Sequence, residues 1–329
     1  MHTLKSKFIG CGSYVPPTVV TNHDLAKLVE TTDHWIRERT GIKERRVTSG
    51  EKTSDFAIKA AKNAIKASGI NPKDIDLVIT GTVTPDMVFP SVSCLVQNEL
   101  GLTPGIPAFD VSAACSGFLY AVDIADKYIK SGTVKNALVI GVDLFSTIVD
   151  WKDRSTCVLF GDGAGAAVLS ASHGKSGILS SRIHSDGRYW EMLYAPAKFS
   201  HSVFDKKSAS ETEPPYLKMK GNETFKIAVR TMGEAIKEVL ADSGLTGSDV
   251  SLLIPHQANM RIINAIRERL NLPEEKVFTN LEKYGNTSAG SIPIALDEAI
   301  KEGRIKQGDI LLFVAFGGGL TWASQIVRW

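Results

Sequence analysis

Residues 68–79 read Ser-Gly-Ile-Asn-Pro-Lys-Asp-Ile-Asp-Leu-Val-Ile, and residues 243–254 read Ser-Gly-Leu-Thr-Gly-Ser-Asp-Val-Ser-Leu-Leu-Ile. The offset of 175 positions is constant along both stretches. In each stretch a Ser-Gly pair ends an amphipathic helical segment, and an apolar run typical of a buried strand follows. The chain therefore contains the same helix–turn–strand unit twice.

The likeness extends beyond this unit. Asn-Glu-Leu-Gly-Leu at 98–102 is echoed by Glu-Arg-Leu-Asn-Leu at 268–272. An extended run, a helix and an apolar strand follow in both parts, at 107–111, 116–130 and 137–142, and at 276–281, 288–301 and 310–315. Two similar α/β halves predict pseudo-twofold symmetry with a cleft where the halves meet. We place the halves at residues 1–175 and 176–329.

Composition excludes several classes of protein. Of the 329 residues, 43% are hydrophobic and 22% charged, which is ordinary for a soluble globular chain of about two domains. The formal net charge of +2 is too small to indicate a protein that wraps nucleic acid. The longest apolar runs fall far short of the ~20 residues that span a bilayer, and the N-terminal stretch has no signal-peptide core. We expect neither a nucleic-acid nor a membrane partner.

The four cysteines lie far apart, at Cys11, Cys94, Cys115 and Cys157, with no Cys-x-x-Cys pair. The seven histidines lack metal-binding spacing. This pattern favours free thiols in a reducing cytoplasm, and we expect no metal site and no cofactor.

One cysteine stands at a turn suited to chemistry. The segment 110–118, Asp-Val-Ser-Ala-Ala-Cys-Ser-Gly-Phe, ends a strand and opens an apolar helix at Cys115 or Ser116. A thiol at a helix N-terminus faces unpaired N–H groups and the positive end of the helix dipole. We expect this placement to lower its pKa below ~8.5 and to favour the reactive thiolate. The alternative is an inert buried cysteine.

The second half supplies two polar groups at comparable points. His256 follows a predicted strand and precedes a helix at 260–270, and Asn286 lies in the turn that opens the helix at 288–301. Alone, His256 fits a satisfied turn histidine and Asn286 fits a helix N-cap. Together, a thiol, an imidazole and an amide at strand ends of related halves should converge on one cleft. Such a set suits acyl transfer, which needs a nucleophile and donors for an oxyanion.

Two glycine-rich runs have different readings. Ala-Phe-Gly-Gly-Gly-Leu at 315–320 fits either a hairpin turn or a close approach of a backbone N–H to a ligand. Gly-Asp-Gly-Ala-Gly-Ala at 161–166 is not a dinucleotide site, because a strand-like run rather than a helix follows it. We interpret it as a turn between strands.

With these residues placed, the sequence resembles β-ketoacyl-acyl-carrier-protein synthase III, one of the thiolase-like condensing enzymes. The matching stretches are 33–42 (Asp-His-Trp-Ile-Arg-Glu-Arg-Thr-Gly-Ile), 113–118 (Ala-Ala-Cys-Ser-Gly-Phe), 160–166 (Phe-Gly-Asp-Gly-Ala-Gly-Ala), 255–259 (Pro-His-Gln-Ala-Asn), 284–289 (Tyr-Gly-Asn-Thr-Ser-Ala) and 316–319 (Phe-Gly-Gly-Gly). The resemblance implies a five-layered αβαβα fold of two duplicated halves and a homodimer. It implies condensation of a short-chain acyl-CoA with malonyl-acyl carrier protein, releasing CO₂ and CoA.

The resemblance also implies roles for single residues. Cys115 would take the acyl group as a thioester, while His256 and Asn286 hydrogen-bond the malonyl thioester as the enolate forms. The N–H groups of Cys115 and Gly318 would hold the oxyanion. Other matched residues are Trp35, Thr40, Arg154, Asn259 and Phe225 for CoA, Phe89 for the partner's acyl pocket, and Arg261 for docking of the carrier protein. Arg269 could share a basic face with Arg261, or simply be solvated.

Departures and rivals remain. Ser155 follows Arg154 where some relatives carry glycine, and the polar segment 200–215, predicted as an inserted loop, has no counterpart that we can place.

Residue types argue against a thiolase, an elongating synthase and a hydroxymethylglutaryl-CoA synthase. The alternatives are a relative that uses the same three residues to make a secondary metabolite, and a non-catalytic acyl-binding protein. The choice between straight and branched primers stays open.

Overall fold

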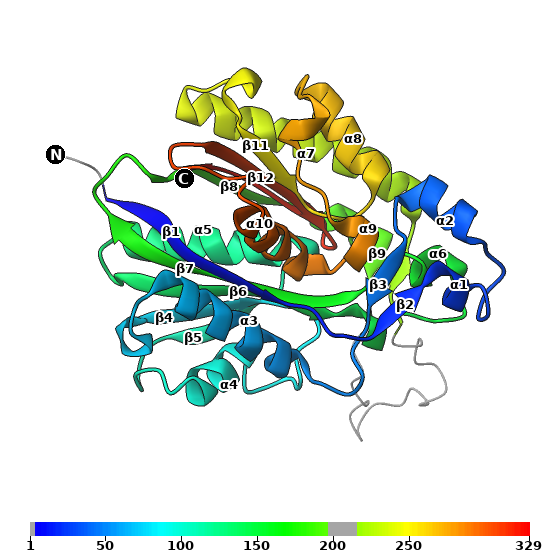
Figure 1. Cartoon of the computed structure of the whole chain (residues 1–329), viewed down its shortest axis with the longest axis horizontal. Helices are drawn as coiled ribbons and strands as arrows, with labels where there is room; N and C mark the ends of the chain where they lie inside the picture. The colour runs from blue at the N-terminus through cyan, green and yellow to red at the C-terminus, as the bar shows by residue number, and fades with distance from the viewer. Residues whose placement is uncertain (1–3, 197–215) are drawn as a thin grey trace.

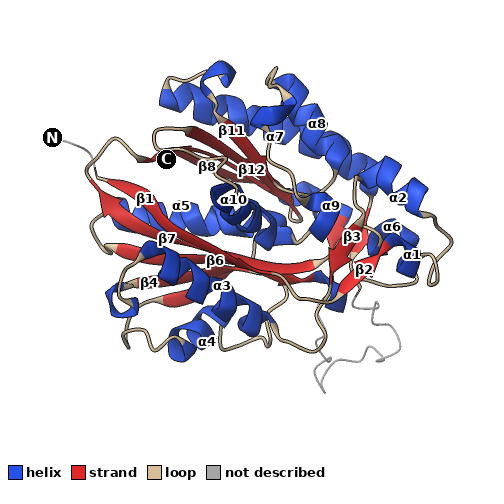
Figure 2. Ribbon diagram, viewed as in Figure 1, coloured by secondary structure: helices blue, strands red, loops and turns tan. Residues whose placement is uncertain are grey.

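The computed structural model describes residues 4–196 and 216–329, and the segment 200–215 lies outside them. Two large β-sheets and three layers of helices alternate in the molecule, as Figure 1 and Figure 2 show. The fold is therefore the five-layered α/β arrangement that the resemblance implies. Within the described part of the chain, no helix has the length and apolar character needed to cross a membrane.

The first sheet has the order β1-β7-β6-β4-β5. Its strands are β1 (Lys5–Tyr14), β4 (Leu77–Gly81), β5 (Ala108–Val111), β6 (Asn136–Leu144) and β7 (Asp162–Ser172). Strand β4 runs parallel to β5 and β6, whereas β7 pairs antiparallel with β1 and β6.

The second sheet has the order β11-β12-β13-β8. Its strands are β8 (Gly177–Ser185), β11 (Leu252–Pro255), β12 (Ile310–Gly317) and β13 (Thr321–Arg328). In reverse, this order matches β1-β7-β6-β4, so each strand has a counterpart in the first sheet. The duplication seen in the sequence is thus a duplication of the sheets.

Two helices form the middle layer, where Figure 2 shows them between the sheets. Helices α5 (Gly117–Lys130) and α10 (Ser291–Lys301) each contact strands of both sheets. Most residues of α10 are buried, which a helix packed on two sides requires. The apolar residues of this layer form one core with the inner faces of both sheets.

Further helices cover the outer faces. Helices α3 (Thr53–Ser68) and α4 (Val92–Glu99) pack on the first sheet, and α7 (Gly221–Ser243) packs on the second with α8 (Met260–Arg269) beside it. Short elements gather at one end of the molecule in Figure 1, to the right of the sheets. They are β2 (Val19–Thr21), α1 (Asn22–Leu25), α2 (Asp33–Thr40), β3 (Glu44–Arg46), α6 (Arg154–Cys157), β9 (Leu193–Tyr194) and α9 (Leu281–Tyr284), and β10 (Lys218–Met219) pairs with β9.

One sequence prediction of local structure was wrong and another was met only in part. The run 276–281, predicted as extended, is extended at Val277, which alone pairs with Leu253, but a 3-10 turn occupies Glu274–Lys276 and α9 starts at Leu281. The chain turns at both ends of this run, so a single residue remains to extend the second sheet. The glycines at 161–166 are not a turn, because β7 begins at Asp162 and pairs on both sides.

Glycines allow the helix-opening turns to reach the first sheet. A side chain at Gly141 of β6 would overlap the backbone carbonyl of Ala289, just before α10. A side chain at Gly81, where β4 ends, would overlap the backbone of Gly117, where α5 begins. Both turns therefore touch the strands beneath them.

We expect Gly141→Ala to lower the free energy of unfolding by about 1–3 kcal/mol, because the added methyl group must displace backbone rather than a flexible side chain. Urea unfolding measures this change. The matched control is Gly187→Ala, since an ideal Cβ at Gly187 meets no atom within 4 Å. Equal losses in the two variants would contradict the packing argument.

Candidate active site

Cys115 lies at the junction of a strand and a middle-layer helix. Strand β5 ends at Val111, and a 3-10 turn over Ala114–Ser116 leads directly into α5. The turn begins at Ala114 in the left-handed region, with φ of +45°. Gly317, at the end of β12, packs on this turn, because a Cβ there would lie 2.7 Å from the Cys115 nitrogen. Both halves of the molecule thus enclose the cysteine, which is 5% exposed.

Two cavities meet at Cys115. Cavity A has a volume of about 790 Å³ and is lined by Cys115 together with Val83, Phe89, Phe145, Leu217 and Gly318. Cavity B, of about 350 Å³, is lined by Cys115 together with Trp35, Phe225, His256, Asn259 and Asn286. The sequence predicted convergence of the thiol, imidazole and amide, and the structure places all three on the wall of cavity B.

His256 follows β11 and is 3% exposed. Its Nδ1 lies 2.6 Å from the hydroxyl oxygen of Ser291, the first residue of α10. That oxygen also lies 3.4 Å from the Gln257 N–H, so it can accept from Gln257 and donate to Nδ1. This arrangement favours the tautomer protonated on Nε2. Burial lowers the pKa of His256 to about 3, so the ring is neutral at physiological pH.

Asn286 is held at both its backbone and its side chain. Its N–H donates to the Leu159 carbonyl at 2.8 Å, and its carbonyl accepts from the Gly161 N–H at 3.0 Å. The side-chain oxygen Oδ1 accepts from the Ser288 N–H at 2.8 Å. With Oδ1 engaged, the amide presents its Nδ2 hydrogens toward the cavity and the thiol. The backbone of residues 159–161 thus helps to fix Asn286.

The prediction of a low-pKa thiol was wrong. Burial, with a smaller contribution from the nearby charge of Asp143, raises the pKa of Cys115 to about 12, against hydrogen bonding from Ser288 and Asn286. A helix N-terminus contributes about 0.3–1 kcal/mol, which is less than the cost of ionising a fully buried thiol. The free protein therefore holds Cys115 as a thiol.

Two residues that support this site, Asp143 and Ser291, were not predicted from the sequence. Asp143 is fully buried at the end of β6, and its carboxylate accepts hydrogen bonds from Val83 at 2.8 Å and from Ala289 at 3.3 Å. It thereby joins the wall of cavity A to the turn that carries Asn286, and burial raises its pKa to about 6. An acidic residue directly after the apolar run 137–142 was the available signal. Ser291 gave no signal, because only its position against His256 reveals it.

Of the residues matched to CoA binding, all but Arg154 line cavity B, and Arg154 lies against Trp35. The guanidinium of Arg154 lies 4.9 Å from the centre of the Trp35 ring and also donates to the Glu30 carbonyl at 2.8 Å. Arg39 stacks on the same ring at 4.9 Å. Thr40 lines the cavity, although its hydroxyl already donates to Ile36 at 2.6 Å.

The remaining predicted site residues differ in where they lie relative to the two cavities. Asn259 caps α8, and its amide donates to the Arg39 carbonyl at 3.1 Å. Arg261 lies 5.4 Å from the centre of the Phe225 ring, at the wall of cavity B. Arg269, by contrast, does not line the cavity, and its guanidinium lies over Gly233 of α7. Phe89 lines cavity A and is 82% exposed in the single chain.

Comparison with known proteins gives a consistent result. The family model described as 3-oxoacyl-[acyl-carrier-protein (ACP)] synthase III matches residues 109–187, and its C-terminal counterpart matches residues 240–329. The curated beta-ketoacyl-[acyl-carrier-protein] synthase III of Aquifex aeolicus (strain VF5) is 53% identical, over 98% of this chain and 99% of the relative. The one from Alkalilimnicola ehrlichii is 52% identical over the same shares.

Solved structures agree with these sequence matches. The crystal structure of 3-oxoacyl-[acyl-carrier-protein] synthase III from Aquifex aeolicus VF5 superimposes with a TM-score of 0.91 at 53% identity, covering 98% of this chain and 100% of that one.

We expect iodoacetamide to modify Cys115 slowly at neutral pH. A thiol with a pKa of about 12 is almost fully protonated there, so the rate should rise with pH and show no plateau below about pH 10. Mass spectrometry of the Cys115 peptide, from protein treated at a series of pH values, measures the rate. A plateau that begins near about pH 8 would show that the buried thiol ionises more easily than its surroundings indicate.

Proposed function

This chain belongs to the 3-oxoacyl-[acyl-carrier-protein] synthase III family, and from that premise we propose that Cys115, His256 and Asn286 carry its reaction. The protein is a condensing acyltransferase of fatty acid synthesis. It joins a short acyl-CoA primer to malonyl-acyl carrier protein and forms a 3-oxoacyl-acyl carrier protein, releasing CO₂ and CoA. The observation that carries the assignment of residues is that Cys115, His256 and Asn286 all line cavity B, while Cys115 also lines cavity A.

Acyl transfer to Cys115 is the first step. The sulfur attacks the thioester carbonyl of acyl-CoA, the thiol proton passes to the departing CoA sulfur, and an acyl-cysteine remains. The N–H groups of Cys115 and Gly318 would hold the oxyanion that forms during the attack. The apolar wall of cavity A supports placement of the acyl chain there, and the pantetheine arm would occupy cavity B.

Decarboxylation of the malonyl group is the second step. Cleavage of its C–C bond releases CO₂ and leaves an electron pair that spreads onto the thioester oxygen as an enolate. The neutral His256 can donate through Nε2, and Asn286 can donate through Nδ2, so both would stabilise that oxygen. The enolate carbon then attacks the acyl-cysteine carbonyl, and collapse of the adduct releases the product and the Cys115 thiolate, which regains a proton.

Binding roles follow from the outer part of cavity B. We assign Trp35, Thr40, Arg154, Asn259 and Phe225 to CoA binding, and Arg261 with Arg269 to docking of the acidic carrier protein. For Arg154 the supporting contact is its stacking on Trp35, which offers a flat site for an adenine ring. Arg269 has weaker support than Arg261 as a docking residue, because its guanidinium lies against Gly233 of α7.

We further propose a cytoplasmic homodimer in which Phe89 of each chain bounds the acyl pocket of the other. Met87, Val88 and Phe89 form an exposed apolar segment beside cavity A, with Phe89 82% exposed, and such a segment favours a protein interface. All four cysteines are free thiols, which suits a reducing compartment. We place the two halves at residues 1–175 and 176–329, because the strands of the two sheets lie within 5–172 and 177–328.

Incubation with acetyl-CoA tests the nucleophile. We expect mass spectrometry to find an acetyl group on the Cys115 peptide of the native protein and none on Cys115→Ala. No adduct with any short acyl-CoA would favour the alternative of a non-catalytic acyl-binding protein.

Separate removal of the two donors tests the second step. His256→Ala and Asn286→Ala should still take up the acyl group, because that step depends chiefly on the sulfur. Their decarboxylation of malonyl-acyl carrier protein should fall by about 100-fold or more, the usual effect of losing one oxyanion donor. Release of labelled CO₂ measures it. Unchanged decarboxylation in either variant would remove that residue from the enolate-stabilising pair.

Ser291→Ala should slow decarboxylation by about tenfold and leave acylation of Cys115 unchanged, because His256 loses the partner of its Nδ1. Ser291→Thr is the matched control, since it keeps a hydroxyl group and should restore most of the rate. A variant that slows both steps equally would indicate a structural role for Ser291 rather than a positioning role.

A further inference from the structure

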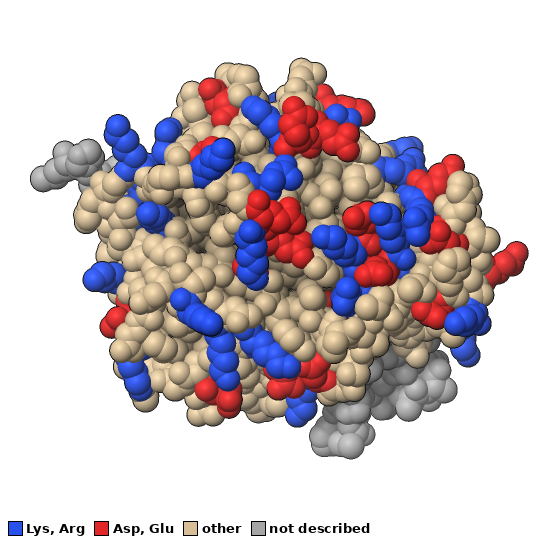
Figure 3. All heavy atoms as spheres, in the orientation of Figure 1, with Lys and Arg blue, Asp and Glu red and all other residues tan. Residues whose placement is uncertain are grey.

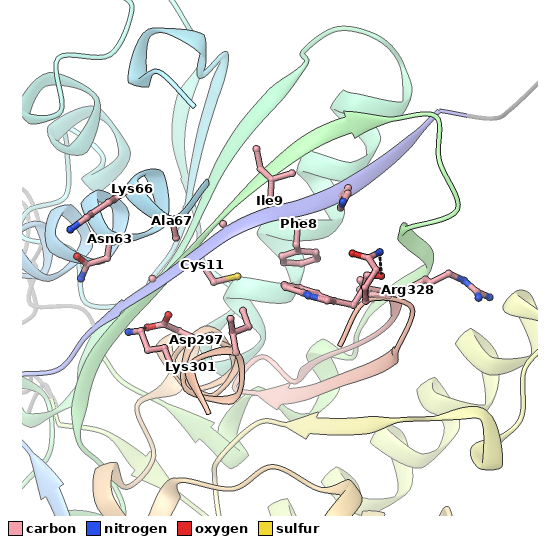
Figure 4. A pocket seen from close by; sticks show the side chains of 16 residues that line it. Phe8, Ile9, Cys11, Asn63, Lys66, Ala67, Asp297, Lys301 and Arg328 are labelled. Carbon is pink, nitrogen blue, oxygen red and sulfur yellow. Dashed lines mark hydrogen bonds and ion pairs between the residues drawn. The ribbon is translucent and has the colours of Figure 1, made fainter. Parts of the chain in front are cut away.

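A third hollow lies at the edge of the first sheet, separate from cavities A and B. Its floor is β1, and α3, α10 and the end of β13 form its sides; Figure 4 shows it from close by. We call it the β1 pocket. Its volume of about 680 Å³ falls within the range of small-molecule sites in proteins. It shares no lining residue with either cavity at Cys115, so the reaction described above does not use it.

The walls of the β1 pocket are largely apolar. Phe8 and Trp329 provide aromatic surface, with ring centres 6.2 Å apart, and Ile300 of α10 and Val327 of β13 add aliphatic surface. The buried Cys11 also lines the pocket, and in Figure 4 its sulfur lies on the same side of β1 as Phe8. An apolar ligand segment would therefore leave water on binding here.

The charged lining of the β1 pocket is unbalanced. Four cationic residues line it, namely Lys7, Lys66, Lys301 and Arg328, against the side chain of Asp297 and the carboxylate of the last residue, Trp329. Asp297 is 2% exposed and already accepts from Ser13 and from Lys301, the latter at 2.7 Å. Figure 4 shows Lys66 and Lys301 on the two helices that flank β1.

The other cations of the lining are unpaired within the described part of the chain. Among residues 4–196 and 216–329, the side chains of Lys7, Lys66 and Arg328 have no ion pair and no hydrogen bond. Unpaired positive charge beside apolar walls matches a ligand that carries negative charge and an apolar body. A small inorganic anion would leave the walls exposed, and a neutral apolar ligand would leave the cations unpaired.

We propose that the β1 pocket is a second binding site, for an amphipathic anion with a carboxylate or phosphate head and an alkyl chain. The head would pair with one cation at the rim, Lys66 at one end of the pocket or Arg328 at the other, and the chain would cover Ile300 and Trp329. The proposal does not depend on the assignment of the reaction to Cys115, because the two sites share no residue.

Calorimetric titration at saturating CoA, which keeps cavity B occupied, tests this site. The probes are decanoate, decyl phosphate and decyl maltoside, all below their micellar concentrations. We expect one saturable site per chain for at least one of the two anions, and binding of the neutral decyl maltoside about tenfold weaker or worse. Binding of both anions would indicate recognition of charge alone, whereas binding of one would identify the head group.

Charge variants locate the site. Lys66→Glu combined with Arg328→Glu should weaken binding of the anion by about tenfold or more, and the milder pair Lys66→Gln and Arg328→Gln should weaken it by a smaller factor. The matched control combines Lys73→Glu with Lys283→Glu, two exposed lysines outside the pocket that change the net charge equally. Turnover without the probe should stay at the native level in all variants, which shows that they are folded. Native affinity in the pocket variants, equal affinity for decyl maltoside, or no saturable binding of either anion would overturn the proposal.

Discussion

Contact between two turns, over 114–116 and 288–290, is the constraint on which the rest of the structure depends. Each turn opens a helix of the middle layer, one from each half of the chain. They can meet only because Gly81, Gly117 and Gly141 leave the strands and helix starts without side chains at the points of closest approach. This backbone contact brings Cys115 to Asn286, and the first residue of α10 then reaches His256. The duplication thus creates the site, since neither half contains all three groups.

Burial determines the charge state of the site. The same exclusion of water that raises the pKa of Cys115 to about 12 lowers that of His256 to about 3, so both groups are neutral in the free protein. A neutral imidazole still has one N–H group that can donate a hydrogen bond. Such a donor can stabilise the oxygen of an enolate. Cys115, in contrast, is a weak nucleophile while it is protonated. It must therefore lose its proton during acyl transfer rather than before it.

The sequence was informative where chemistry is encoded locally. The repeat predicted both halves, and the segments around Cys115, His256 and Asn286 predicted the three side chains that meet. Prediction from the sequence failed for features that depend on contacts with residues far away along the chain. The ionisation of Cys115 depends on burial by Gly317 and its surroundings, the role of Ser291 depends on its contact with His256, and the single pairing of Val277 depends on turns at both of its ends. The β1 pocket likewise combines residues from the first and last strands, which no local motif connects.

A crystal structure of the protein soaked with acetyl-CoA would test the central claim most directly. We expect an acetyl group on the Cys115 sulfur, with its carbonyl oxygen about 3 Å from the backbone nitrogens of Cys115 and Gly318 and its methyl group in cavity A. His256 and Asn286 should then remain free to receive the second substrate. An unmodified sulfur, or an acetyl oxygen bound by His256 and Asn286 instead, would contradict it.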